Sequence, residues 1–187
     1  MISPVTLSHP RVPIILEAFA TLPVLRTDRL ILRAPKVEDF ALYVSLMSSD
    51  RAQYLGGPSD VETAWADFTN YTAGWLLRGD GMFSVADQGT LVGFVFAGIE
   101  PGDDAIELGW LFSSTVEGHG VAFEASCAVL NHLTSLGIET VASYIDPRNA
   151  RAEALAKRLG ALRIGEWDGS EVWNYDLDGP VAGALGA

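Results

Sequence analysis

The sequence has little cysteine and no metal-binding spacing. Cys127 is the only cysteine among 187 residues, so no disulfide can form within the chain. The chain has no Cys-x-x-Cys pair, and its three histidines, His9, His119 and His132, lie far apart. These absences predict a metal-free protein of the cytoplasm.

Basic residues are also scarce. The chain has 12 Lys and Arg against 24 Asp and Glu, a formal net charge of -12. Binding to phosphate backbones or to an anionic membrane surface needs clustered positive charge, so neither nucleic acid nor a membrane is an expected partner. Charged residues make up 19% and hydrophobic residues 49%, which favours a folded domain over a disordered chain or a coiled coil.

Long hydrophobic runs are missing as well. The longest apolar stretch, residues 12–25, is interrupted by Pro13, Glu17 and Pro23 and is too short to span a bilayer. We expect residues 1–24 to form an N-terminal extension that packs on the domain. We expect one domain at residues 25–178, and a flexible tail of small, uncharged residues at 179–187.

The hydrophobic periodicity predicts alternating strands and helices. Strands are expected at residues 29–33, 82–86, 90–99, 106–112, 140–145, 162–166 and 172–177. Helices are expected at residues 36–47, 59–78, 118–136 and 149–159. This order indicates an α+β domain with one mixed sheet and helices on its faces.

The second expected helix carries an aromatic row. Trp65, Phe68, Tyr71 and Trp75 are spaced by three, three and four residues, which places them along one helix face. The row is expected to pack in the core or in a dimer contact; the alternative is one wall of an acceptor pocket.

The segment most informative about chemistry is a strand followed by Gly118-His-Gly120 at the start of a helix. The first amides of a helix have no acceptor within the helix, and the helix dipole places positive potential there. Glycine allows a bulky anion to approach the main chain, and a protonated His119 adds charge. We therefore expect a phosphate cradle; the alternative is a simple tight turn. Neither of the standard nucleotide fingerprints is present.

A second segment, residues 143–161, has a strand end, then Asn149, then a short helix that ends at Leu159-Gly160. Together with the cradle, and with the opening at residues 25–33 followed by Glu38-Asp39, it resembles the GNAT family of N-acetyltransferases. The similarity is greatest to the Rim-type branch that acetylates ribosomal-protein N-termini, and it spans about residues 25–178.

The resemblance implies a GNAT fold, with a mixed, mostly antiparallel sheet, helices on both faces and two central parallel strands that splay apart. It implies acetyl-CoA as the cofactor and direct acetyl transfer to a primary amine, either a peptide N-terminus or a small molecule. The implied cofactor-binding residues are Phe112, Ser113, Gly118, His119, Gly120, Val121, Ala122 and Asn149. A homodimer is one option for the oligomeric state.

The resemblance also suggests catalytic residues. Glu107 occupies a carboxylate position that this branch often has on the central strand, and it is the candidate base. Strand alternation predicts that it lies on the face opposite Leu108 and Trp110. The hydroxyl-bearing positions of relatives are Ala152 and Ala156 here, so Tyr144 is the candidate substitute acid. Asp103 and Asp104 are either contacts for a cationic substrate or solvated loop residues.

Glu117 departs from the branch pattern, because it places a negative charge beside the proposed diphosphate site. At an effective dielectric of about 20, a like charge about 4 Å away costs roughly 4 kcal/mol, so Glu117 is expected to point to solvent when cofactor binds. Glu117 and the missing hydroxyls motivate a second hypothesis, a catalytically attenuated binding or regulatory module. A third is an unrelated α+β domain whose glycines only shape a turn.

Overall fold

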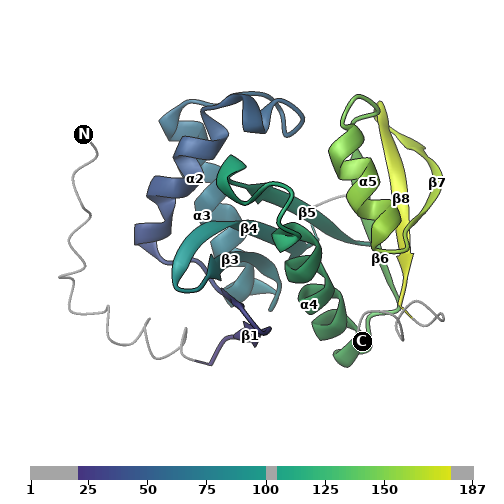
Figure 1. Ribbon diagram of the computed structural model, residues 1–187, viewed down its shortest axis with the longest axis horizontal. Helices are drawn as coiled ribbons and strands as arrows, with labels where there is room; N and C mark the ends of the chain where they lie inside the picture. The colour runs from purple at the N-terminus through teal and green to yellow at the C-terminus, as the bar shows by residue number, and fades with distance from the viewer. Residues whose placement is uncertain (1–20, 100–104, 178–187) are drawn as a thin grey trace.

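The computed structural model describes residues 21–99 and 105–177, which form one eight-stranded sheet (Figure 1). Most of the expected N-terminal extension, the tail, Asp103 and Asp104 lie outside the described residues. The strand order is β1-β2-β3-β4-β5-β6-β8-β7. The strands are β1 (Leu25–Arg26), β2 (Leu30–Arg33), β3 (Gly81–Asp87), β4 (Thr90–Gly98), β5 (Ile106–Phe112), β6 (Thr140–Ile145), β7 (Leu162–Trp167) and β8 (Ser170–Asp176).

Only β5 and β6 pair in parallel, and every other neighbouring pair in this sheet is antiparallel. The prediction of a mixed, mostly antiparallel sheet is therefore confirmed. β1 was not predicted, because two residues are too few to show an alternating pattern.

Helices cover both faces of the sheet, as predicted. They are α2 (Phe40–Met47), α3 (Val61–Leu77), α4 (Val121–Ser135) and α5 (Ala150–Arg158), with short 3₁₀ turns η1 (Val37–Asp39), η2 (Asp50–Ala52) and η3 (Ser114–Val116). Figure 1 shows α2 and α3 grouped on the N-terminal half of the sheet and α5 beside β6 and β8. Successive strand residues point to opposite faces, so β4 contributes Phe94 to the core under α2 and α3, and Val95 to the core under α4.

The two central parallel strands separate soon after they begin. Their pairing is limited to Ile106 with Val141 and Glu107 with Ala142. β5 stays paired with β4 up to Phe112, while β6 turns away to pair with β8. The predicted splayed pair is therefore present, and the gap opens beyond Glu107.

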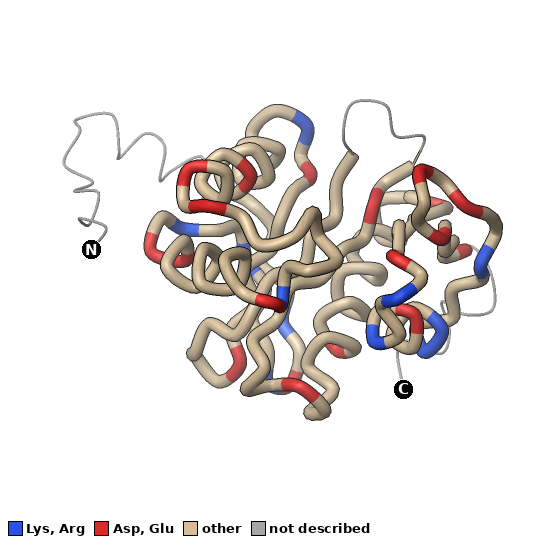
Figure 2. The backbone as a smooth tube through the Cα atoms, turned by 90° about the horizontal axis from the view of Figure 1, so that it is seen from above, with Lys and Arg blue, Asp and Glu red and all other residues tan. Residues whose placement is uncertain are grey.

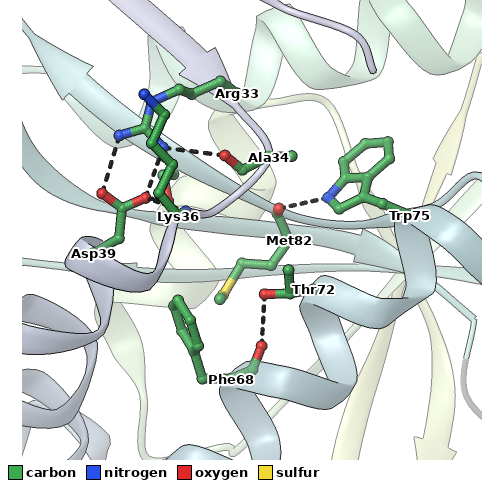
Figure 3. A network of polar contacts seen from close by, with 9 residues as sticks. Arg33, Ala34, Lys36, Asp39, Phe68, Thr72, Trp75 and Met82 are labelled. Atoms are coloured by element: carbon green, nitrogen blue, oxygen red, sulfur yellow. Dashed lines mark hydrogen bonds and ion pairs between the residues drawn. The ribbon is translucent and has the colours of Figure 1, made fainter. Parts of the chain in front are cut away.

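A buried polar network fixes the start of α2 against the sheet (Figure 3). Arg33 Nη1 and Nη2 donate to the two Asp39 oxygens at 2.6 and 3.0 Å. Asp39 also accepts from the Lys36 amide at 2.8 Å and from Ser84 Oγ at 2.7 Å. Burial alone raises the pKa of Asp39, but the hydrogen bonds from Arg33, Lys36 and Ser84 outweigh it and lower that pKa.

Helix α4 begins later than predicted. The sequence pattern placed its start at residue 118, but α4 begins at Val121. Gly118 and Gly120 have φ of +79° and +74°, in the left-handed region that a right-handed helix cannot contain. The two glycines therefore form the turn before the helix instead of its first residues.

Candidate active site

A groove of about 510 Å³ runs along the open side of β5, between the start of α4 and the first turns of α5. Its walls are made by segments that are far apart in sequence, including η2 and the turn before α4. Seven of the eight residues predicted to contact the cofactor line this groove: Phe112, Ser113, Gly118, Gly120, Val121, Ala122 and Asn149.

The turn before α4 presents main-chain donors to the groove. The first helical hydrogen bond runs from the Glu124 amide to the Gly120 oxygen at 3.0 Å. The amides that precede Glu124 in the helix have no acceptor within it, which makes this end a ready anion site. A Cβ on Gly118 would meet nothing within 4 Å, so glycine is required there by the positive φ and not by lack of space.

The open side of β5 also exposes strand main-chain groups. The Ser113 amide donates to the Val92 oxygen at 2.9 Å, so it points toward β4. Main-chain direction alternates along a strand, so Trp110 turns its N–H and C=O toward β6, where the strands have separated. Trp110 is not among the site residues predicted from the sequence.

Asn149 lies at the groove wall as the N-cap of α5. Its Oδ1 accepts a hydrogen bond from the Ala152 amide at 3.2 Å. The cap occupies the side-chain oxygen and leaves the side-chain NH₂ group as the donor that can face the groove.

The groove is cationic although the chain is strongly acidic. The charged residues lining it are Arg51, Glu117, Arg151 and Arg158, a local net charge of +2. Five of the twelve Lys and Arg residues lie between positions 148 and 163, and Figure 2 shows basic residues gathered at that end of the molecule. An anionic ligand is therefore attracted to this groove in spite of the overall charge of -12.

Glu117 is held by two arginines. Its Oε2 lies 2.7 Å from Arg51 Nη1, and its Oε1 lies 2.7 Å from Arg151 Nη1. The hydrogen bonds from Arg151 and Arg51 lower the pKa of Glu117, so the carboxylate is ionised at neutral pH. The sequence placed a negative charge here and did not predict its partners; the structure pairs it with Arg51 and Arg151.

Two predicted residues are not brought to the groove. His119 lines an adjoining surface hollow with Arg29 and Glu124, and its main-chain oxygen accepts from Arg29 Nη2 at 2.8 Å. Tyr144 lies on the other face of β6 from Ser143, where its ring packs 5.5 Å from that of Trp167. Neither residue is therefore among those that line the groove.

A second, smaller cavity of about 120 Å³ lies on the opposite face of β5, under α2 and α3. Glu107 lines it, on the face opposite Leu108, as the strand alternation predicted. Trp110 and Leu111 line both this cavity and the groove. The two spaces therefore meet at the end of β5, where the strands have separated.

Asp67 of α3 places a second carboxylate in this cavity. Within residues 21–99 and 105–177 the Asp67 carboxylate makes no hydrogen bond or ion pair, and burial raises its pKa. Burial, together with the charge of Asp67, raises the pKa of the neighbouring Tyr43 hydroxyl. Sequence reasoning missed Asp67, although it lies four residues before Tyr71, on the same helix face.

The aromatic row of α3 divides between core and cavity. Phe68 and Trp75 are buried, and Trp75 Nε1 donates to the Met82 oxygen at 2.8 Å (Figure 3). Tyr71 lines the cavity beside Glu107. The predicted core packing is therefore confirmed for Phe68 and Trp75, whereas Tyr71 lines a cavity.

Cys127 is buried in α4, and burial raises the pKa of its thiol to about 11. It is a core residue. Among the described residues, no three His, Cys, Asp or Glu side chains gather as metal ligands, and no helix is long and apolar enough to cross a membrane.

Comparison with known proteins agrees with this geometry. Residues 29–162 match the sequence profile of the Acetyltransferase (GNAT) domain. An acetyltransferase from Agrobacterium tumefaciens is similar over 83% of this chain and 95% of its own, with 31% identity and a TM-score of 0.78. A putative GNAT-family acetyltransferase from Bordetella pertussis has 26% identity and a TM-score of 0.65 over 81% of this chain and 97% of its own.

A RimL ribosomal-protein alpha-N-acetyltransferase in complex with coenzyme A is similar in fold. It has 20% identity and a TM-score of 0.70, over 83% of this chain and 99% of that one. Among curated proteins, none matches the chain.

Proposed function

Because the chain belongs to the GNAT acetyltransferase family, we propose that it transfers an acetyl group from acetyl-CoA directly to a primary amine. The amine is either a peptide N-terminus or a small molecule. The observation that carries this proposal is the meeting of two different spaces at Trp110 and Leu111. One space is a cationic groove with free helix amides, and the other is an apolar cavity that holds carboxylates.

The groove residues suit the cofactor. The amides at the start of α4 and the arginines at the groove wall would hold the diphosphate. The open edge of β5 near Phe112 and the Asn149 side chain would hold the pantetheine arm. Bound acetyl-CoA supplies an acetyl thioester, which an amine attacks without a covalent enzyme intermediate.

The cavity residues suit the acceptor. Two carboxylates, Glu107 and Asp67, beside apolar and aromatic side chains attract an ammonium group. Glu107 would take the proton that the amine must lose before it can attack. The Trp110 amide would donate to the thioester oxygen as negative charge develops there.

The thiolate of coenzyme A that leaves in the reaction needs a proton donor. Ala152 and Ala156 carry no hydroxyl, and Ala156 is fully buried. Tyr144 is still the candidate proton donor from the sequence. Its ring packs on Trp167, so the side chain would have to change its position to reach the groove. The alternative function, a binding or regulatory module with weakened catalysis, rests on these two alanines.

The experiment is an acceptor screen. The purified protein is incubated with acetyl-CoA and a panel of peptides with free N-termini, amino acids, polyamines and amine antibiotics. Free thiol release and product mass are measured. Acetylation of one acceptor class supports the proposal, and the product mass identifies the class. Binding of acetyl-CoA by calorimetry without turnover on any acceptor supports the regulatory alternative.

We also propose that the protein acts in the cytoplasm, because a chain with one cysteine cannot form an internal disulfide, as many secreted proteins do. Its oligomeric state, for which a homodimer is one option, is tested by light scattering on the purified protein.

A further inference from the structure

Glu117 connects the two walls of the cofactor groove. Arg51 comes from η2, at the N-terminal side of the groove, and Arg151 comes from the first turn of α5, at the other side. Each donates to a different oxygen of the same carboxylate, at 2.7 Å. The carboxylate therefore lies between the guanidinium groups, next to the turn that presents the main-chain donors.

A diphosphate matches the arginines that Glu117 now occupies. Guanidinium groups donate in a fixed fork that fits carboxylate and phosphate oxygens alike. A phosphate carries at least the charge of a carboxylate, and here it would also accept from the amides before α4. The same two arginines thus have two competing anionic partners, one of which belongs to the protein.

The arginines can keep their places when Glu117 leaves. Arg51 Nε donates to the Phe112 oxygen at 3.1 Å, which anchors the side chain to the end of β5. Arg151 extends from the regular helix α5. The Glu117 side chain is 44% exposed, so it can turn to solvent without disturbing the core.

We propose that the diphosphate of the cofactor replaces the Glu117 carboxylate as the partner of Arg51 and Arg151. This inference rests on the proposed function and deepens it. Arg51 and Arg151 become diphosphate-binding residues, and Glu117 becomes an internal competitor. It offsets one of the three positive charges of the groove in the free protein and lowers the affinity for the cofactor.

The test is a calorimetric titration of coenzyme A into four variants. Removing the competitor with Glu117→Gln is expected to tighten binding about fivefold, the size of one exposed ion pair. Arg51→Gln and Arg151→Gln are each expected to weaken binding about tenfold, since each removes a charged hydrogen bond to phosphate. Glu153→Gln is the matched control: it removes one negative charge from α5, outside the groove, where Glu153 pairs with Lys157. It should bind like wild type.

Two further ligands identify the atoms involved. Dephospho-coenzyme A keeps the diphosphate and should show the same fivefold gain with Glu117→Gln as coenzyme A does. Pantetheine has no phosphate and should show none. A gain that disappears with dephospho-coenzyme A assigns the arginines to the 3′-phosphate and overturns the proposal, and so does a gain that persists with pantetheine.

The outcomes separate this inference from the function on which it rests. If wild type binds coenzyme A and Glu117→Gln binds it equally or more weakly, the carboxylate is a structural support and the inference is wrong, while the proposed function stands. If neither protein binds coenzyme A, the proposed function itself fails. Thermal unfolding of each variant checks that the fold is intact.

Discussion

Ser143 Oγ donates a hydrogen bond of 2.5 Å to the Leu108 main-chain oxygen, at the point where β5 and β6 separate. The same hydroxyl lies 3.1 Å from the Tyr175 hydroxyl, which can donate to it. Ser143 is 1% exposed, so its hydroxyl satisfies a carbonyl that would otherwise be buried without a partner. The Ser143 side chain therefore stabilises the place where β5 and β6 separate and the groove begins.

Replacing Ser143 by Ala is expected to lower the free energy of unfolding by about 1–3 kcal/mol, because it leaves the Leu108 oxygen and the Tyr175 hydroxyl unsatisfied. Urea unfolding measures the change. Ser135→Ala is the control, since its exposed hydroxyl can be replaced by water, and a loss below about 0.5 kcal/mol is expected. Equal losses of unfolding free energy in the two variants would contradict this structural role of Ser143.

Gly120→Glu is expected to abolish binding of coenzyme A while the fold survives. A Cβ on Gly120 would lie 3.8 Å from Arg29 Nη2, so the new carboxylate would stand at the turn beside the main-chain donors. The positive φ would add about 1–2 kcal/mol of strain. Gly137→Glu is the matched control, because Gly137 has φ of +79° and lies at the other end of α4. Both variants should lose similar stability, and only the first should lose binding by calorimetry. An unchanged affinity of Gly120→Glu for coenzyme A would contradict the prediction that this turn binds phosphate.

Glu107→Gln is expected to lower turnover about 100-fold, because it removes the proposed general base. The affinity for coenzyme A should stay at wild type, since Glu107 does not line the groove. Steady-state kinetics and calorimetry measure the two quantities. A wild-type rate across the pH range would show that Glu107 is not the base.

Asp67→Asn is expected to raise the KM for the amine about tenfold with a small change in kcat, because it removes a charged partner of the ammonium group and not the base. Its pKa is raised in the folded protein, so its charge disfavours the fold at neutral pH. The variant should therefore also be slightly more stable. Glu62→Gln, on the exposed side of the same helix, should change neither quantity. A fall in kcat with unchanged KM would contradict this role.

Asp39 is expected to make stability depend on pH. Its pKa is lowered on folding, so its contribution is complete above the unfolded value of about 4 and is lost as pH falls through the folded value. Asp39→Asn should lower the free energy of unfolding at neutral pH by roughly 2–4 kcal/mol, since the partly buried Arg33 loses its partner.

Urea unfolding between pH 7 and pH 2 measures this effect. The difference between wild type and Asp39→Asn should shrink on the acid side. A difference that stays constant with pH would show that the charge of Asp39 contributes nothing. Asp28→Asn, at an exposed position, should follow wild type throughout.

Much of the fold could be predicted because the signals are local. Alternation in residues 106–112 predicted both the strand and the side on which Glu107 lies. Glycines at 118 and 120 predicted a turn that opens a helix, although the two residues form the turn and the helix starts after it. The spacing of polar and apolar residues does not reveal the sign of φ at the two glycines. It therefore could not predict the residue at which the helix begins.

The sequence by itself determined the order of the strands after β1 and of the helices, the position of the glycine turn before α4 and the face of the candidate base. Only the tertiary structure decided which charges meet: Glu117 lies 66 residues from Arg51 and 34 from Arg151 in the chain. The same holds for Asp67 and Glu107, which reach one cavity from a helix and a strand. Local patterns follow from the neighbours of each residue, whereas these contacts depend on how the helices pack on the sheet, which no short stretch of sequence specifies.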